Sequence, residues 1–160
     1  MQHRWPPLDD VFVWLTRLGS HGAIWFAIAF VLALLRRDVR TFVLVAIAVL
    51  AADGLAGLVK IAVHEHRPRG THPLVAIPHS GSFPSGHTAT AFAAATMLTA
   101  IAPRGAAAWI VLAAAIAYSR LYVGVHYPLD VAGGIAIGVV TALLLRAAAR
   151  RGSPRSRRRG

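Results

Sequence analysis

The sequence contains no cysteine among its 160 residues. This absence excludes disulfide bonds, a thiolate nucleophile and any metal site built on cysteine sulfur. Acidic residues are also scarce, with six Asp and Glu against 17 Lys and Arg. Five loop residues could suggest a metal site, but their spacing matches no standard ligand set, so we predict no metal and favour a solvated loop. They are His64, Glu65, His66, His72 and His79.

The N-terminus lacks the pattern of a cleaved signal peptide, because residues 1–10 carry two prolines and two acids before any apolar run. Membrane insertion is therefore expected to depend on internal apolar segments. Such segments are abundant, since 56% of the residues are hydrophobic, 14% are charged and the mean hydropathy is +0.58. This composition is too apolar for an ordinary soluble domain and predicts an integral membrane protein.

Five apolar segments are candidates for membrane-spanning helices, each of which needs about 20 mainly apolar residues. They cover residues 22–35, 41–63, 86–102, 106–123 and 128–149. The first is short unless it includes the preceding turn. Frequent Gly and Ala favour close packing between these helices. We therefore predict an all-α integral membrane helical bundle with about five transmembrane helices, in a single domain over residues 1–150.

Both ends of the chain differ from these segments. Residues 8–18 place apolar side chains at helical spacing, with Asp9, Asp10 and Arg17 among them. This segment is too short to span a bilayer, so we expect an amphipathic helix in the membrane interface. A re-entrant segment, or a sixth span, is the alternative. Residues 151–160 have nothing to bury and are predicted to form a disordered, basic, cytoplasmic tail.

The distribution of basic residues predicts the orientation. The net charge of +11 could indicate nucleic-acid binding, but six arginines crowd into the last eleven positions. A positive-inside signal in contact with anionic lipid is the simpler account, so no nucleic-acid partner is predicted. With five spans and a cytoplasmic tail, eleven of the 17 basic residues lie inside: Arg36, Arg37, Arg40, Arg104, Arg146, Arg150, Arg151, Arg155, Arg157, Arg158 and Arg159.

Three polar clusters, far apart in the sequence, fall at the helix ends that this topology turns away from the cytoplasm. They are Lys60 with Arg67 and Pro68; Pro84, Ser85, Gly86 and His87; and Ser119, Arg120, His126 and Asp130. Ionisable residues in a membrane protein usually mark function. Their three cations would repel one another in one outward pocket unless an anion neutralised them, and a phosphate fits this requirement.

The start of the third apolar segment supplies further anion-binding groups. Ser85, Gly86 and His87 would occupy the first turn of a helix, where free backbone N–H groups and the positive dipole end bind anions. Gly86 permits close approach of the backbone. Ser85 can cap the helix or donate its hydroxyl to a phosphoryl oxygen.

Two histidines can make and break bonds at such a site. Asp130 follows His126 by four residues, so its carboxylate would lie one helical turn away and hold the imidazole in one tautomer. A neutral imidazole beside three cations can attack phosphorus directly and form a phosphohistidine, while His87 protonates the departing oxygen. Water would then hydrolyse the intermediate.

These clusters resemble the three signature motifs of the type 2 phosphatidic acid phosphatase family, which shares its core with the vanadium haloperoxidases. Here the motifs are Lys60-x6-Arg67-Pro68, Pro84-Ser85-Gly86-His87 and Ser119-Arg120-x5-His126-x3-Asp130. They occur in order over residues 60–130, and no motif position departs from the pattern. The chain is most similar in kind to small bacterial undecaprenyl-diphosphatase-like members. Many bacterial members have six spans, so the N-terminal topology is the point of difference.

The resemblance implies a metal-independent lipid phosphatase without a cofactor, in the bacterial plasma membrane, with its site on the non-cytoplasmic side. It implies His126 as nucleophile, Asp130 as its partner and His87 as general acid. The residues that it assigns to phosphate binding are Lys60, Arg67, Ser85, Gly86 and Arg120.

The substrate is expected to be a phosphomonoester or diphosphate of a membrane lipid. Isoprenyl diphosphate, phosphatidic acid and phosphatidylglycerophosphate are the candidates, and the small size of the chain and its outward site favour polyprenyl carriers. A phosphorylated polyprenyl sugar also fits, and the loop over residues 69–83 is expected to select the headgroup. A lipid phosphate and membrane lipids are thus the predicted partners, and the oligomeric state is left open.

Structural interpretations of the same residues stand beside these. Lys60 alone would be an interfacial anchor, His87 a hydrogen-bonded residue at a helix start, and His126 with Asp130 a structural cap pair. Asp53 lies inside the second apolar segment, nearly on the face of Lys60, where an acid suggests either function or a protonated or hydrogen-bonded packing residue.

Two alternative functions also remain. A vanadate-dependent peroxidase would use the same pocket but would need a soluble scaffold, which the hydropathy argues against. A non-catalytic protein that binds or transports lipid phosphates would not require an acid, a nucleophile and an orienting carboxylate together.

Overall fold

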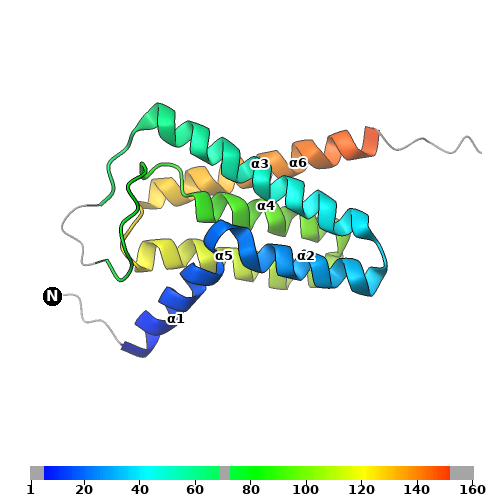
Figure 1. Ribbon diagram of the computed structural model, residues 1–160, viewed down its shortest axis with the longest axis horizontal. Helices are drawn as coiled ribbons and strands as arrows, with labels where there is room; N and C mark the ends of the chain where they lie inside the picture. The colour runs from blue at the N-terminus through cyan, green and yellow to red at the C-terminus, as the bar shows by residue number, and fades with distance from the viewer. Residues whose placement is uncertain (1–5, 69–72, 152–160) are drawn as a thin grey trace, which may run out of the picture.

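The structure is a computed structural model that describes residues 6–68 and 73–151. Within these residues every regular element is helical, as the sequence predicts (Figure 1). Most of the predicted tail, residues 152–160, lies outside the described part, and α6 continues through Arg151. The elements are α1 Pro6–Leu18, η1 Ser20–Gly22, α2 Ala23–Arg36, α3 Val39–Val63, α4 Gly86–Ile101, η2 Pro103–Gly105, α5 Ala106–Tyr122 and α6 Pro128–Arg151.

The length of these helices refines the predicted number of spans. In the described residues, α3, α6 and the continuous η2–α5 segment are long and apolar enough to cross a membrane by themselves. Helices α1 and α2 pass the same test together, as a pair bent by 53°. Helix α4 has only 16 residues, fewer than the roughly 20 that a span needs. By length and composition, three of the five predicted segments are complete spans in the described residues, the first qualifies only together with α1, and the third, α4, is shorter than a span needs.

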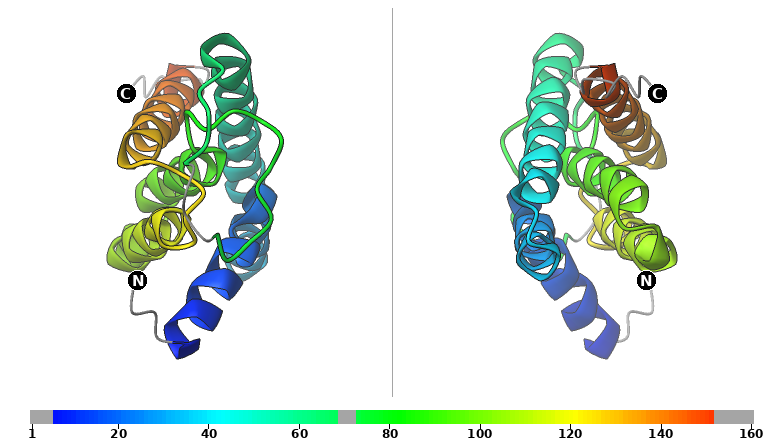
Figure 2. Two further views of the ribbon diagram at one scale, coloured as in Figure 1. Left: turned by 90° about the vertical axis from the view of Figure 1, so that its left-hand side faces the viewer. Right: turned by 90° about the vertical axis from the view of Figure 1, so that its right-hand side faces the viewer.

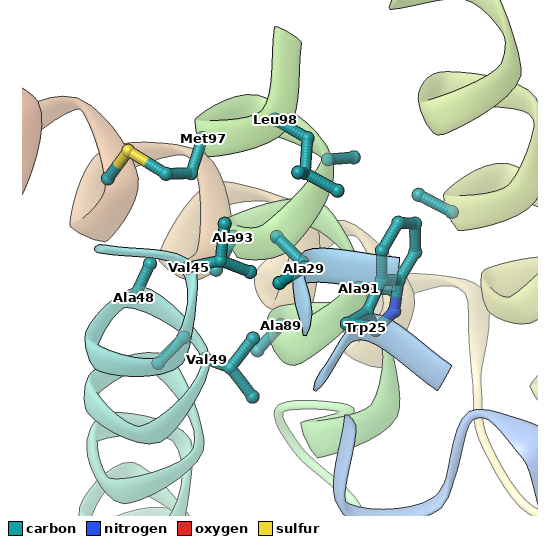
Figure 3. Close-up of a cluster of buried hydrophobic side chains, with 14 of the residues drawn as sticks. Trp25, Ala29, Val45, Ala48, Val49, Ala89, Ala91, Ala93, Met97 and Leu98 are labelled. Carbon is teal, nitrogen blue, oxygen red and sulfur yellow. The ribbon is translucent and has the colours of Figure 1, made fainter. Parts of the chain in front are cut away.

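Helix α4 is central because its side chains are small. It packs against α3, α5 and α6, and end-on views place it between these helices (Figure 2). Alanines cover it on several sides, and Trp25 from α2, Val45 and Val49 from α3, and Met97 and Leu98 from α4 itself fill the remaining space (Figure 3). Short side chains on α4 allow its neighbours to approach closely, which is how helices in membranes gain packing contacts.

Helices α4 and α6 approach each other so closely that two positions of α6 have no room for a side chain. A Cβ on Gly134 would lie 2.6 Å from the backbone oxygen of Ser85, and one on Gly138 would lie 2.4 Å from that of Ala89. These glycines are one helical turn apart and face α4. The start of α6 is thereby pressed against the start of α4, and the Ser85 backbone N–H donates to the Asp130 backbone oxygen at 2.9 Å.

The break between α1 and α2 turns the N-terminal helix out of the bundle. His21 and Gly22 have φ angles of 51° and 74°, both in the left-handed region. A Cβ on Gly22 would lie 2.6 Å from the side chain of Val49, so glycine is needed there for packing as well as for conformation. Helix α1 leaves the bundle axis at this break (Figure 1).

Helix α1 then packs on the end of α5. The Phe12 ring lies 4.2 Å from the Tyr122 ring and 5.4 Å from the Tyr118 ring, centroid to centroid. The Tyr122 hydroxyl donates to Asp9 Oδ1 at 2.8 Å. The exposed apolar side chains of α1 include Val11 and Trp14. The predicted amphipathic helix is thus present, and its place in the membrane interface stays a prediction.

All three polar clusters lie at one end of the bundle. That end carries the C-terminus of α3, the N-termini of α4 and α6, the C-terminus of α5 and the long connection between α3 and α4 (Figure 1). The opposite end has the short turns, including Asp38, whose side chain caps α3 by accepting from the Arg40 backbone N–H at 3.0 Å. The chain therefore brings residues from four helices together at a single face.

A methyl group at Gly138 tests the α4–α6 contact. Gly138→Ala places a carbon 2.4 Å from the Ala89 backbone oxygen, so the helices must separate. We expect the free energy of unfolding to fall by about 1–3 kcal/mol, measured by denaturation in detergent. Gly54→Ala is the matched control, because nothing lies within 4 Å of the added carbon and alanine favours a helix. Equal stability of Gly138→Ala and the wild type would contradict the contact.

Candidate active site

A cavity of about 300 Å³ opens where the polar clusters meet, and we call it the catalytic cavity. Its walls come from α3, α4, α5, the α1–α2 break and the two connecting loops. Six of the eight predicted site residues line it: Lys60, Arg67, Gly86, His87, Arg120 and His126. Asp130 and Ser85 are completely buried behind this wall.

His126 is held against the cavity by Asp130. Its Nδ1 lies 3.0 Å from Asp130 Oδ2, and both side chains are buried. The same oxygen accepts from the Tyr127 backbone N–H at 2.8 Å and from the Ser82 hydroxyl. On the other side of the ring, Nε2 lies 3.3 Å from Arg67 Nη1, which can only donate. We therefore assign the proton to Nδ1 and the lone pair to Nε2, where it accepts from Arg67.

The surroundings also keep the His126 imidazole neutral. Burial lowers the pKa of His126 below its ordinary value, and the positive charges of Arg120 and Arg67 lower this pKa further. The hydrogen bond with Asp130 acts in the opposite direction but is the smaller effect. A neutral ring with Nε2 unprotonated is the form that can act as a nucleophile.

Lys60 and Arg67 organise the loop in front of α4. Lys60 Nζ donates to the backbone oxygens of Gly81 and Ser82, each at 3.1 Å, and to that of Pro84. Arg67 donates to the backbone oxygens of Ser80 at 3.1 Å, Gly81 at 3.2 Å and Val125 at 2.9 Å. Both cations thus face the cavity while backbone oxygens offset part of their charge. Lys60 is bound to this loop, which argues against a simple interfacial anchor.

Ser85 does not act as a side-chain cap of α4, contrary to one of the two predicted roles. It occupies the N-cap position, but its hydroxyl makes no cap hydrogen bond and accepts from Thr88 Oγ1 at 3.0 Å. Ser85 is fully buried, and its backbone N–H donates to the Asp130 backbone oxygen in the first turn of α6. Gly86 lines the cavity, and a Cβ there would point to Asp53 Oδ1 at 3.6 Å.

Two residues of the N-terminal segment, Thr16 and Ser20, contact Arg120 and His87, and the sequence did not reveal these contacts. Ser20 Oγ lies 3.3 Å from His87 Nε2, and Thr16 Oγ1 accepts from Arg120 Nη1 at 2.6 Å. Ser119 of the third motif also points to Thr16, at 3.0 Å. Thr16 and Ser20 are one turn apart at the α1–η1 junction, a weak polar signal that the sequence alone could not connect to α4 and α5.

Ser82 is the other supporting residue that the sequence did not reveal. It is fully buried, and its hydroxyl donates to Asp130. It lies 44 positions before His126 and belongs to no predicted motif. Only the path of the connection between α3 and α4 brings it to the His126–Asp130 pair.

Asp53 faces the catalytic cavity, beside Lys60 and His87. Its side chain is exposed, so it is not the hydrogen-bonded packing residue that was one of the two interpretations. Its predicted position on the face of Lys60 is confirmed. The His-rich loop shows no group of three potential metal ligands among the described residues, and His72 lies outside them.

Neutralising Arg67 tests the electrostatic account of His126. Because the Arg67 charge lowers the pKa of His126, Arg67→Gln is expected to raise this pKa toward its ordinary value. Side-chain NMR of the histidines in detergent would follow the titration, with His126→Gln identifying the signal. An unchanged or lower His126 pKa in Arg67→Gln would show that the guanidinium does not act on this ring.

Known proteins share this sequence pattern. Residues 42–152 match the model of the PAP2 superfamily. The chain is 35% identical over 136 residues to decaprenylphosphoryl-5-phosphoribose phosphatase of Mycobacterium tuberculosis, covering 82% of this chain and 75% of that protein. It is 30% identical over 138 residues to undecaprenyl-diphosphatase of Sulfolobus acidocaldarius, covering 82% and 66%.

The fold is also shared with a solved membrane enzyme. The crystal structure of a transmembrane PAP2 type phosphatidylglycerolphosphate phosphatase from Bacillus subtilis superposes with a TM-score of 0.78 at 25% identity, covering 95% of this chain and 81% of that chain. The resemblance drawn from the three motifs is therefore confirmed, together with the all-helical membrane fold. From the sequence match, the relatives and the fold together, this integral membrane protein belongs to the PAP2 superfamily.

Proposed function

We propose that the protein hydrolyses a phosphate group of a membrane lipid by attack of His126 on phosphorus. Hydrolysis of lipid phosphates or diphosphates is the activity by which its relatives are named. One observation carries the residue assignment: the buried His126–Asp130 pair turns an unprotonated Nε2 toward a cavity that Lys60, Arg67 and Arg120 also line. Such a cavity combines a nucleophile with cations for the transferred phosphoryl group.

In the first step, a bond forms between His126 Nε2 and phosphorus while the bond from phosphorus to the lipid oxygen breaks. Asp130 accepts the Nδ1–H hydrogen bond and stabilises the positive charge that develops on the ring. In the substrate complex the negative charge of the bound phosphate favours a protonated His87, which gives its proton to the departing oxygen and becomes neutral. The three cations balance the charge on the remaining phosphoryl oxygens.

In the second step, water releases the phosphate. His87, now neutral, accepts a proton from the water as its oxygen bonds to phosphorus and the bond to His126 Nε2 breaks. The products are inorganic phosphate and a lipid alcohol, or a lipid monophosphate where the substrate was a diphosphate. His87 ends protonated and His126 neutral, so the enzyme returns to its starting state.

The proposed substrate is an isoprenoid lipid that carries a terminal phosphate. Two relatives with similar sequences are named for decaprenyl and undecaprenyl substrates. A phosphatidylglycerolphosphate phosphatase shares the fold at lower identity, which supports the broader class of lipid phosphates more than a particular lipid. The catalytic cavity is lined mainly by polar and charged side chains, which suit the phosphate, so we place the selection of the tail outside this cavity.

Replacement of the nucleophile gives the most direct test. His126→Ala should lower phosphate release from isoprenyl diphosphate in detergent by at least about a thousandfold, as loss of a nucleophile does in other enzymes. The control is His64→Ala, an exposed loop histidine that does not line the catalytic cavity. Phosphate-labelled substrate should leave an acid-labile, alkali-stable label on the wild type and none on His126→Ala. Full turnover by His126→Ala would overturn the mechanism.

Chelation and vanadate separate the proposed chemistry from its alternatives. Phosphate release should survive EDTA, because the charges at the phosphate are those of Lys60, Arg67 and Arg120. Vanadate should inhibit it by occupying the same cavity as a mimic of pentavalent phosphorus. Loss of activity in EDTA would contradict metal independence. Peroxidase activity with vanadate, or tight lipid-phosphate binding without release, would instead support one of the two alternative functions.

The proposed orientation places the catalytic cavity outside and the C-terminus in the cytoplasm, which the excess of arginine at the opposite end supports. The absence of native cysteine makes single-cysteine labelling clean. His79→Cys, on the cavity side, should react with an impermeant thiol reagent in intact cells, whereas Arg104→Cys should react only after lysis. The reverse pattern would invert the orientation.

A further inference from the structure

A second cavity, of about 450 Å³, adjoins the catalytic cavity, and we call it the N-terminal cavity. Pro78, His87 and Arg120 line both cavities, whereas His126 lines only the catalytic one. Its remaining walls are the α1–η1 segment and part of the connection between α3 and α4. The residues that belong to the N-terminal cavity alone are Thr16, Arg17, Ser20, Leu74, Val75 and Ala76.

The proposed mechanism, on which this inference rests, predicts which side of the phosphoryl group faces the N-terminal cavity. In a displacement at phosphorus, the attacking and leaving atoms lie on opposite sides of the phosphoryl group. Here the attacking atom is His126 Nε2, and the leaving oxygen must lie within reach of the acid, His87. The leaving part of the substrate therefore extends past His87, toward the cavity that His87 and Arg120 share with the α1–η1 segment.

The charges of the N-terminal cavity fit an anion. Two arginines, Arg17 and Arg120, line this cavity, and no Asp or Glu does among the described residues. Arg120 is 4% exposed, its Nη1 donates to Thr16, and its Nε has no hydrogen-bond partner among the described residues. A guanidinium carries five N–H donors, so Arg120 retains donors for a ligand.

Arg17 stands on the open side of the same cavity. Its side chain is exposed, and its guanidinium carbon lies 5.9 Å from the centroid of the Trp14 ring. Stacking on an aromatic ring leaves the edge of the guanidinium free to bind an anion with paired hydrogen bonds. Arg17 also lies before residue 42, where the match to the superfamily model begins. It is therefore not part of the shared catalytic motifs.

We infer that the N-terminal cavity binds the leaving part of the substrate and that Arg17 recognises a second phosphoryl group there. The substrate class is then a lipid whose leaving part is itself anionic. Either a diphosphate or a phosphorylated sugar attached through a lipid phosphodiester satisfies this requirement. A simple lipid monophosphate does not, because its leaving part is an uncharged alcohol.

Substrates with the same tail test this assignment. Farnesyl diphosphate and farnesyl monophosphate differ only in the second phosphoryl group, and a farnesyl-phosphoryl sugar with a terminal phosphate places that group one sugar away. The variants are Arg17→Gln and Arg17→Lys, assayed in full-length protein in detergent. The matched control is Arg104→Gln, an exposed arginine that lines neither cavity.

We expect Arg17→Gln to lower kcat/KM about tenfold, through KM, for a substrate with a second phosphoryl group, since charged hydrogen bonds are the stronger ones. The monophosphate should change less than about twofold, and Arg17→Lys should retain part of the preference. If only one of these two substrates, the diphosphate or the phosphosugar, loses activity in Arg17→Gln, that substrate shows which distance between the two phosphoryl groups the cavity accepts.

An equal effect of Arg17→Gln on all three substrates, or no effect on any, would overturn this inference. A preference of the wild type for the monophosphate would overturn it as well. All three results leave the proposed function intact, because the wild type still releases phosphate. A wild type that releases phosphate from none of the three would instead overturn the proposed function, and the inference with it.

Discussion

The close contact between α4 and α6 is the constraint on which the catalytic geometry depends. Gly134 and Gly138 let the two backbones approach to a distance that any Cβ would block. At the end of this contact, the Ser85 N–H donates to the Asp130 backbone oxygen. The first turn of α4, where we expect an anion to bind, and the start of α6, which holds Asp130 against His126, are thereby fixed to each other. Small residues thus do in this membrane bundle what larger apolar cores do in soluble proteins.

The same end of the bundle must hold three cations together before any substrate arrives. Lys60 and Arg67 bind backbone oxygens of the loop before α4, and Arg120 binds the Thr16 hydroxyl. These oxygens carry partial negative charge and oppose repulsion between the cations without neutralising it. Burial lowers the pKa of His126, the remaining positive field lowers it further, and the same field attracts an anion. Structure and reactivity of the site therefore follow from the same hydrogen bonds.

The features that the sequence could predict are those that depend on local spacing. His126 and Asp130 are four residues apart at a helix start, and the polar motifs stand at ends of apolar segments, so their meeting followed from topology. Ser82, Thr16 and Ser20 could not be found in this way, because their contacts join segments tens of residues apart through irregular connections. The length of α4 was predicted to within one residue, but its central position was not, since an alanine-rich segment gives no sign of how its neighbours enclose it.

The division of the chain into a matched and an unmatched part bears on how one fold serves several lipids. The superfamily match over residues 42–152 includes the proposed nucleophile, the proposed acid and the three cations, so the groups to which we assign phosphoryl transfer lie in the matched part of the chain. The segment before it supplies Thr16 and Ser20, which contact Arg120 and His87 from outside. A wall built from this segment can vary in shape and charge without moving the reacting groups. Substrate choice can thus change while the catalytic contacts stay the same.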